Sequence, residues 1–316
     1  MTTNAIVLER PGKLGLQSLA LNELGADDLL VDVAFSGIST GTERLLWSGQ
    51  MPSFPGMGYP LVPGYESVGT VIDAGSKARS RIGDTVFVPG ANCYGSVRGL
   101  FGGASRRLTV PSSRAPKVPE SLGKDGVLLA LAATAYHALA QPDARPPELI
   151  VGHGVLGRLL ARISLALFSN EPVVWDAQEG RLHGAEGYTA IHPDTDQRAD
   201  YGAIYDVSGD HSLLDPLIGR LAKGGQLVLA GFYHQPLQFD FPAAFMREAR
   251  IRVAAEWQPS DLESALALIG SGDLSLDGLI THTTVLEGTN SAEAAYARAF
   301  TDADCLKMTI DWRAAA

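Results

Sequence analysis

The spacing of apolar and polar positions changes character after the first third of the chain. Up to about Val118, short apolar and β-branched runs are separated by Gly and Pro, which predicts an antiparallel, barrel-like arrangement of short strands. These runs include 29–35, 67–73 and 84–89. From about Leu122 the apolar residues follow helical spacing, and a helix over 127–139 leads to a Pro-rich stretch at 142–147.

Beyond this stretch, strand patterns and helix patterns alternate. Strands are expected at 148–151, 173–176, 203–207 and 226–230, with a helix that ends near Phe168. Such alternation predicts parallel βαβ units in a doubly wound sheet, and hence an α/β protein. A helix over 261–269 and a strand over 307–310 look like a return to the first domain. We therefore expect one domain at 1–120 that is completed by 247–316, and a second domain at 121–246.

Composition and charge exclude several classes of function. The formal net charge is -10 over 316 residues and no Lys or Arg run reverses it locally, so nucleic acid is not expected as a partner. Cys93 and Cys305 are the two cysteines, which fits a reducing cytoplasm. No run of about eighteen apolar residues occurs, and 1–10 lacks the pattern of a signal peptide. We expect a cytoplasmic protein without an integral membrane segment.

A glycine turn lies between the strand at 148–151 and the following helix. Its residues are Gly152, His153, Gly154, Val155, Leu156 and Gly157. In a G-x-G-x-x-G turn the first glycine permits the bend, the second lets the backbone approach a pyrophosphate, and the third lets helix and strand pack closely. The alternative is a tight strand-to-helix turn without a ligand. The flanking βαβ pattern favours a dinucleotide-binding Rossmann domain.

Acidic and small residues at later strand ends extend this prediction. Asp176 lies nineteen residues after Gly157 at the end of the second strand, where a carboxylate can accept hydrogen bonds from the adenosine ribose. A 2′-phosphate would meet like charge there, so NAD is preferred to NADP, although Arg181 is close in sequence. Ser208 and Gly231 follow two further strands and are candidates for contact with the cofactor or for ordinary turns.

Three segments carry a resemblance to a known family over nearly the whole chain. They are Gly64-Tyr65-Glu66-Ser67-Val68-Gly69, Gly83-Asp84-Thr85-Val86 and Thr134-Ala135-Tyr136-His137. In order and spacing they resemble the medium-chain dehydrogenase/reductase family. The resemblance implies a GroES-like β-barrel catalytic domain, a Rossmann domain with the active cleft between them, a role for Thr134 behind the nicotinamide, and a homodimer.

The zinc ligands of that family have no counterpart here. Its first Cys aligns with Ser39, its His with Tyr65, and its third ligand falls near Ala130. No metal is therefore expected. Four residues would occupy the vacated shell, and we take them as the catalytic candidates: Ser39, Thr42, Tyr65 and Glu66. Tyr65 would contact the substrate oxygen, Ser39 would extend the hydrogen-bond chain and Glu66 would assist or orient. The alternative is that Tyr65 only fills the space and Glu66 only packs.

A narrower resemblance within the family covers 36–66 and 304–312. It implies NAD-dependent oxidation of a secondary alcohol on a large, flat bacteriochlorin pigment. Aromatic residues of 47–59 would hold such a ligand, and an arginine would pair with its propionate. The candidate arginines are Arg44, Arg98, Arg106 and Arg107. Two alternatives remain open: a zinc-free quinone or enoyl reductase, and a non-catalytic NADH-binding protein.

Overall fold

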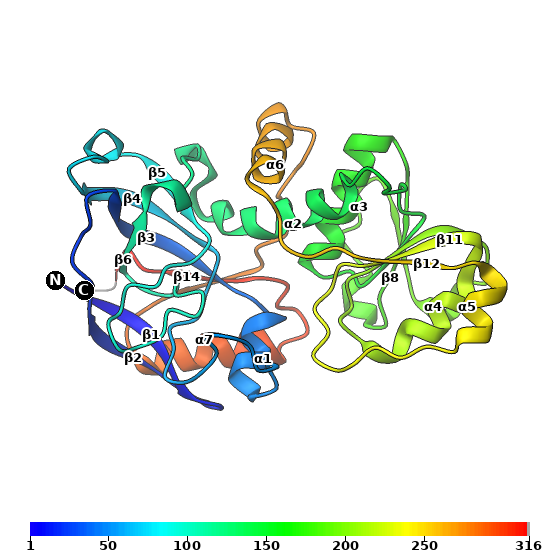
Figure 1. The fold of residues 1–316 in the computed structure, drawn as a ribbon, viewed down its shortest axis with the longest axis horizontal. Helices are drawn as coiled ribbons and strands as arrows, with labels where there is room; N and C mark the ends of the chain where they lie inside the picture. Colours follow the sequence, from blue (N-terminus) through cyan, green and yellow to red (C-terminus); the bar gives the residue numbers. More distant parts are fainter. Residues whose placement is uncertain (315–316) are drawn as a thin grey trace. The chain divides into compact units, whose positions relative to one another are not determined.

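The computed structural model describes residues 1–314 and divides the chain into two compact units. The first unit contains Met1–Ala130 and the chain from Leu279 onward, and the second contains Leu131–Gly278. Figure 1 shows the fold coloured along the sequence. Among the described residues, no helix has both the length and the apolar character that a membrane span requires.

The first unit is built mainly from antiparallel strands. Its strands are β1 (Thr2–Arg10), β2 (Lys13–Ala20), β3 (Asp28–Ile38), β4 (Ser67–Ala74), β5 (Thr85–Val88), β6 (Arg107–Pro111), β13 (His282–Val285) and β14 (Met308–Asp311). Its helical elements include α1 (Thr42–Ser48), η3 (Glu120–Leu128) and α7 (Thr289–Thr301). β1 pairs with β2, and the larger sheet has the order β13-β14-β3-β4-β5, with β6 also paired to β3.

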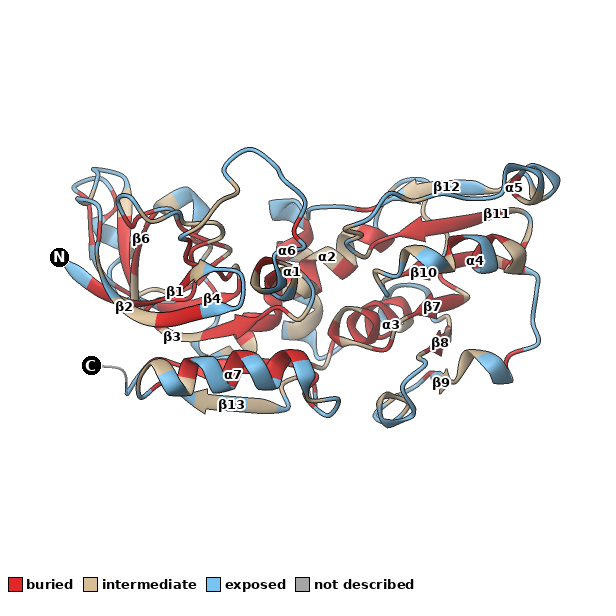
Figure 2. Cartoon of the chain, turned by 90° about the horizontal axis from the view of Figure 1, so that it is seen from below, coloured by how far each residue is buried: buried red, intermediate tan, exposed pale blue. Residues whose placement is uncertain are grey.

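The end of the chain completes this first sheet. Strand β14 pairs antiparallel with β3, so that Met308 lies opposite Ile38 and Asp311 opposite Phe35. Helix α7 buries one face of small and aromatic residues, and Figure 2 shows buried and exposed stretches alternating along it. The predicted return of the C-terminal segment to the first domain is therefore confirmed for the chain from Leu279 onward.

The second unit is a doubly wound parallel sheet. Its strands are β7 (Leu149–Val151), β8 (Val173–Trp175), β9 (Thr189–Ile191), β10 (Tyr201–Asp206), β11 (Leu221–Leu229) and β12 (Arg250–Val253). Its helices are α2 (Leu129–Leu139, which begins at the unit boundary), α3 (Val155–Phe168), α4 (Leu214–Arg220), α5 (Phe241–Arg247) and α6 (Pro259–Ser271). In Figure 1, α3 lies on one side of the sheet and α4 and α5 lie on the other.

The strand order of the second sheet indicates where a ligand would bind. The six parallel strands run β12-β11-β10-β7-β8-β9, so the chain reverses its direction of travel across the sheet between β7 and β10. In such sheets ligands bind beyond the carboxyl ends of the strands at this switch point. Gly152 follows β7 and Ser208 lies two residues beyond β10, so both predicted residues lie at that edge.

The unit boundaries differ from the expected ones. We expected 121–246 to form the second domain and 247–316 to complete the first. Strand β12, however, pairs in parallel with β11 and therefore belongs to the second sheet. Helix α6 also belongs to this unit, where the carboxylate of its first-turn Asp261 lies 2.8 Å from the ring of His137 on α2. The segment 121–130 stays with the first unit, where Gly126 packs against Val68 of β4.

Candidate active site

Two hydroxyl groups meet where β3 and β4 approach each other at one end of the first unit's sheet. Ser39 directly follows β3, and Tyr65 lies two residues before β4, whose Ser67 is paired with Ser36. The Ser39 Oγ and Tyr65 Oη atoms are 2.7 Å apart. The backbone N–H of Thr42, the first residue of α1, donates to Ser39 Oγ over 3.3 Å. The structure thus brings three of the four predicted catalytic residues together.

Tyr65 lies in a setting that keeps its hydroxyl protonated. The side chain is half-buried, and the ring of Phe101 packs edge-on against it with 5.2 Å between centroids. Phe101 itself has a left-handed backbone with φ of 67°, a conformation that non-glycine residues rarely adopt and that is costly to hold. Burial raises the pKa of Tyr65, and the nearby Glu66 carboxylate raises it further, against the hydrogen bonds from Ser39 and Thr42.

Glu66 does not join this hydroxyl pair but forms a buried ion pair. Its Oε2 lies 2.5 Å from the Nζ of Lys307, and the two side chains are 1% and 2% exposed. Burial raises the pKa of the Glu66 carboxyl, whereas the charge of Lys307 opposes that rise. Its second oxygen, Oε1, has no hydrogen-bond partner among the described residues. Glu66 therefore influences Tyr65 through its negative charge, which opposes ionisation of the phenol and does not assist it.

Glu43 is a fifth polar residue of this cluster, and the sequence reasoning missed it. It lies in the first turn of α1 and is buried. One carboxylate oxygen accepts the backbone N–H of Ser39, and the other accepts the hydroxyl of Tyr296 over 3.1 Å. Burial raises the pKa of Glu43 to about 8, helped by the charge of Glu66. Near neutral pH this carboxyl therefore holds a proton.

The side chains of this cluster do not suit a zinc ion. Zinc sites use Cys, His and carboxylate ligands. At the three positions that align with the family's zinc ligands, Ser39 and Tyr65 provide hydroxyl groups and Ala130 provides no ligand atom. The two carboxylates nearby are already bonded to Lys307, Tyr296 and backbone N–H groups. Over residues 1–314, no three His, Cys, Asp or Glu side chains are grouped closely enough to hold a metal ion.

The glycine turn of the second unit has the shape that a pyrophosphate requires. Gly152 has φ of 103°, and a Cβ at Gly157 would lie 1.8 Å from the Gly152 carbonyl oxygen, so larger residues cannot replace either without strain. At Gly154 the space is open, and only Arg181 Nη1 comes within 4 Å, at 3.7 Å. Val155, Leu156 and Gly157 form the first helical turn of α3, whose backbone N–H groups favour an anion. The residues therefore fit a dinucleotide.

Asp176 is fixed beside this turn. Its two carboxylate oxygens accept the backbone N–H groups of His153 and Gln178, each over 2.9 Å. Each oxygen keeps a lone pair that can accept a ribose hydroxyl. The side chain of His153 is completely buried and bonds to the Arg181 carbonyl oxygen. Although His153 is one of the predicted cofactor residues, its side chain therefore stabilises the protein interior.

The remaining cofactor candidates divide into two groups. Ser208 and Gly231 lie at the same sheet edge as the glycine turn: a Cβ at Gly152 would come 3.3 Å from the Ser208 nitrogen, and one at Gly231 would come 3.2 Å from the Val207 carbonyl carbon. Thr134 lies within α2 and is half-buried. Its predicted place behind the nicotinamide stays a prediction.

Comparisons with known proteins agree with this geometry. Residues 25–120 match the family model of the alcohol dehydrogenase GroES-like domain. The 2-desacetyl-2-hydroxyethyl bacteriochlorophyllide A dehydrogenase of Cereibacter sphaeroides is 56% identical over the full length of both chains. The protein of the same name from Rhodobacter capsulatus is 55% identical over 99% of both chains. The chain belongs to the bacteriochlorophyllide A dehydrogenase family.

Solved structures place this family among the alcohol dehydrogenases in fold. A short chain alcohol dehydrogenase of Escherichia coli complexed with NADH is 20% identical and superposes with a TM-score of 0.83 over 98% of this chain and 99% of that one. A protein described as a zinc-binding dehydrogenase of Sinorhizobium meliloti, bound to NADP, gives 20% identity and 0.81 over the same shares. The predicted GroES-like and Rossmann architecture is confirmed, and this member of the bacteriochlorophyllide A dehydrogenase family is an oxidoreductase that acts on CH–OH groups with a nicotinamide cofactor.

Proposed function

We propose that this enzyme oxidises the 3-(1-hydroxyethyl) group of bacteriochlorophyllide a to a 3-acetyl group with NAD, in bacteriochlorophyll a biosynthesis, and without zinc. The full-length identity to two dehydrogenases named for this substrate supports the reaction. The observation that carries the metal-free chemistry is the contact of 2.7 Å between Ser39 and Tyr65 at the positions of two family zinc ligands. A zinc ion would otherwise acidify the alcohol, so a side chain has to accept its proton.

In this proposal Tyr65 contacts the substrate hydroxyl and Ser39 extends the hydrogen-bond chain. Ser39 Oγ accepts the Thr42 N–H and can donate its own hydroxyl proton to Tyr65 Oη. This donation would stabilise a phenolate once the phenol has released its proton to solvent, and that phenolate then accepts the proton of the substrate hydroxyl. Because burial raises the pKa of Tyr65, the step needs a cation in the reacting complex. When bound, oxidised nicotinamide accepts the hydride and carries such a charge.

The direct test combines substrate, cofactor and metal removal. EDTA-treated enzyme is mixed with NAD and the hydroxyethyl pigment, and pigment absorption and NADH formation are followed together. Both should change in step, and Tyr65→Phe should lower kcat by roughly 10² to 10⁴. Full turnover by a folded Tyr65→Phe variant would contradict the assignment of Tyr65. Loss of the wild-type reaction on EDTA treatment would contradict metal independence.

Two further outcomes distinguish the alternative functions. If NADH binds but the pigment does not react, turnover of NADH with quinones or enones identifies a reductase. Binding of NADH without turnover of any alcohol, quinone or enone identifies a non-catalytic binding protein.

The preference for NAD over NADP rests on Asp176. Two backbone N–H groups hold its carboxylate at the edge where the adenosine ribose would lie, and the charge opposes a 2′-phosphate. Asp176→Ser should therefore bring kcat/KM for NADP closer to that for NAD. An unchanged cofactor preference in this variant would remove Asp176 from the role.

The pigment's propionate has two arginine candidates left. Arg106 and Arg107 both pair with Asp32, at 2.6 Å and 3.2 Å, and are thereby occupied. Arg44 and Arg98 are exposed, and Arg44 lies in α1 two residues after Thr42, one of the predicted catalytic residues. We propose Arg44 as the partner. Arg44→Gln should raise the pigment KM without changing the NAD KM, and equal changes in both would contradict this.

The aromatic segment 47–59 is largely fastened to its own unit. Trp47 packs against Phe300 with 5.9 Å between ring centroids, and the Tyr59 hydroxyl donates to the Leu46 carbonyl over 2.5 Å. Phe54 is exposed and is the remaining ring of this segment that we propose for pigment contact.

We also propose a homodimer formed through the open edge of the second sheet. Strand β12 pairs with β11 on one side only, and Val253 on it is 71% exposed. An apolar pocket next to this strand is lined by Phe239, Phe241, Ala244, Phe245, Met246, Ala249 and Ile251, among others. Val253→Lys should give monomers in analytical ultracentrifugation, and an unchanged sedimentation coefficient would contradict this edge as the interface.

The two cysteines are unpaired and buried, which supports our assignment to the cytoplasm.

A further inference from the structure

A buried arginine organises the segment between β8 and β9 around the glycine turn. Arg158 lies in α3 one residue after Gly157 and is 8% exposed. Its guanidinium donates to the carbonyl oxygens of His153 over 3.1 Å, Arg181 over 3.1 Å, His183 over 2.7 Å and Gly184 over 3.1 Å. Three of these carbonyls belong to 177–188, which contains only a short 3-10 helix at Glu179–Arg181. Arg158 therefore contributes three of the hydrogen bonds that hold this segment.

His153 binds the same segment from inside the turn. Its Nδ1 lies 2.6 Å from the Arg181 carbonyl oxygen, and its Nε2 lies 2.8 Å from the Tyr188 hydroxyl. Burial lowers the pKa of His153 to about 4, and the charge of Arg158 lowers it as well. A neutral ring can donate from Nδ1 to the carbonyl and accept from Tyr188 at Nε2, so both contacts are satisfied at once. The Arg181 carbonyl is thus held by two side chains.

These contacts place the Arg181 guanidinium at the ligand side of the turn. Its Nη1 lies 3.7 Å from the position that a Cβ of Gly154 would occupy, where the backbone has to leave room for a pyrophosphate. Its Nε is buried and has no hydrogen-bond partner among residues 1–314. A buried donor without a partner is costly, and a small movement of the guanidinium toward a bound phosphate oxygen would satisfy it.

Positive charge from the helix N-terminus, Arg158 and Arg181 gathers at this end of α3. A helix N-terminus carries partial positive charge, yet its first turn contains no acidic residue and Arg158 comes directly after it. The hydrogen bonds of the Arg158 guanidinium go to carbonyl oxygens, and the Asp176 carboxylate, which accepts the His153 N–H, acts on it through its charge. The arrangement is therefore most stable when negative charge binds in front of the turn.

We propose that Arg158 is a positioning residue for the dinucleotide cofactor: it holds 177–188 against the glycine turn and thereby directs the Arg181 guanidinium to the pyrophosphate. Arg158 touches no ligand itself and acts through Arg181. The inference requires a nicotinamide dinucleotide and is independent of the pigment substrate and of Tyr65.

The test uses NADH binding, measured by fluorescence titration, and trypsin cleavage of the full-length chain without cofactor. Arg158→Lys keeps the charge but loses the planar fork that reaches several carbonyls. We expect the NADH Kd to rise about tenfold or more, which corresponds to about 1.4 kcal/mol. We also expect faster cleavage after Arg181, because its carbonyl is released. Arg181→Ala should weaken NADH binding similarly, and the double variant should be little weaker than Arg181→Ala alone.

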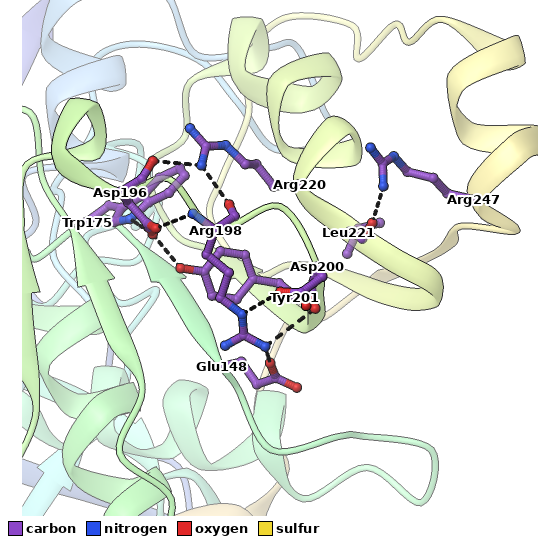
Figure 3. Close-up of polar contacts among 9 residues, drawn as sticks. All are labelled: Glu148, Trp175, Asp196, Arg198, Asp200, Tyr201, Arg220, Leu221 and Arg247. Carbon is purple, nitrogen blue, oxygen red and sulfur yellow. Dashed lines mark hydrogen bonds and ion pairs between the residues drawn. The ribbon is translucent and has the colours of Figure 1, made fainter.

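Arg220 provides a matched control, which Figure 3 shows. It also holds a loop by backbone carbonyls, those of Asp196 at 2.8 Å and Arg198 at 2.6 Å. This loop precedes β10 and so lies at the amino ends of the strands, away from the glycine turn. Arg220→Lys should leave the NADH Kd within about twofold of the wild-type value, well below one tenfold step.

Three results would overturn the proposal. The first is an unchanged NADH Kd in Arg158→Lys. The second is a double variant whose rise in NADH Kd equals the product of the rises in Arg158→Lys and Arg181→Ala. The third is a rise in NADH Kd in Arg220→Lys equal to that in Arg158→Lys. If Arg158→Lys does not fold, Tyr188→Phe takes its place because it removes one hydroxyl from the same group of contacts. Faster cleavage after Arg181 and weaker NADH binding in Tyr188→Phe would support the proposal, and wild-type values for both would overturn it.

Discussion

Replacing Glu43 by Gln should change how the stability of the protein depends on pH. Glu43 is buried, and its pKa rises from the ordinary value of 4.5 to about 8 in the folded chain. Between these two values the folded state binds one proton more than the unfolded state. The contribution of this protonated carboxyl to the free energy of unfolding is therefore fully present below pH 4.5 and is lost as the pH rises through 8. The amide of the Glu43→Gln variant would resemble the protonated carboxyl and would not titrate.

The size of the effect follows from that difference in pKa. One extra proton in the folded state changes the free energy of unfolding by about 1.4 kcal/mol per pH unit. From pH 5.5 to pH 8 the wild-type protein should therefore lose about 3 kcal/mol relative to Glu43→Gln. The geometry supports the comparison, because an amide can accept the Ser39 N–H at its oxygen and donate to the Tyr296 hydroxyl.

Urea unfolding of both proteins at several pH values between 5.5 and 8 measures this difference. Titrations elsewhere in the molecule cancel when the variant is subtracted from the wild type. Glu293→Gln is the control, since Glu293 is exposed on α7, the helix that also carries Tyr296. Parallel stability profiles for wild type and Glu43→Gln would refute the reasoning, because they would mean that Glu43 does not gain a proton on folding.

Two other substitutions test the cluster and the turn. Lys307→Met should destabilise the protein by about 3–5 kcal/mol by leaving the Glu66 carboxylate buried and unpaired, and Lys307→Met with Glu66→Gln should recover most of that loss in the same unfolding assay. Equal stability of the single and double variants would contradict this. Gly157→Ala should abolish measurable NADH binding, because its Cβ would meet the Gly152 carbonyl oxygen at 1.8 Å; retained binding in a fluorescence titration would show that the turn can shift.

The second sheet could be predicted where local pattern and packing agree. Strand β7, the glycine turn and α3 were expected because buried parallel strands are apolar throughout and the turn has its own signature. Strand β12 was missed, since Arg250-Ile251-Arg252-Val253 alternates in type but is mostly exposed at a sheet edge. With β12 unrecognised, residues 247–278 were assigned to the first domain, whereas they belong to the second unit.

The site was predictable only for residues that a local motif marks. Ser39 and Tyr65 came from the family resemblance, and their contact follows from the pairing of β3 with β4. Lys307 and Tyr296 were not found, because they reach Glu66 and Glu43 across 241 and 253 residues of sequence. No periodicity in either segment indicates which distant carboxylate such a residue will meet.

The charges of this cluster also determine what the reaction needs from outside it. Lys307 and Glu66 neutralise each other, and Glu43 is mostly protonated near neutral pH. Because the single ammonium group is already paired, the cluster holds no cation to lower the pKa of Tyr65, which burial raises. The Tyr65 hydroxyl therefore keeps its proton in the free enzyme. In the proposed mechanism it can become a base only in the complex that contains the oxidised, positively charged cofactor, so we infer that proton transfer follows cofactor binding.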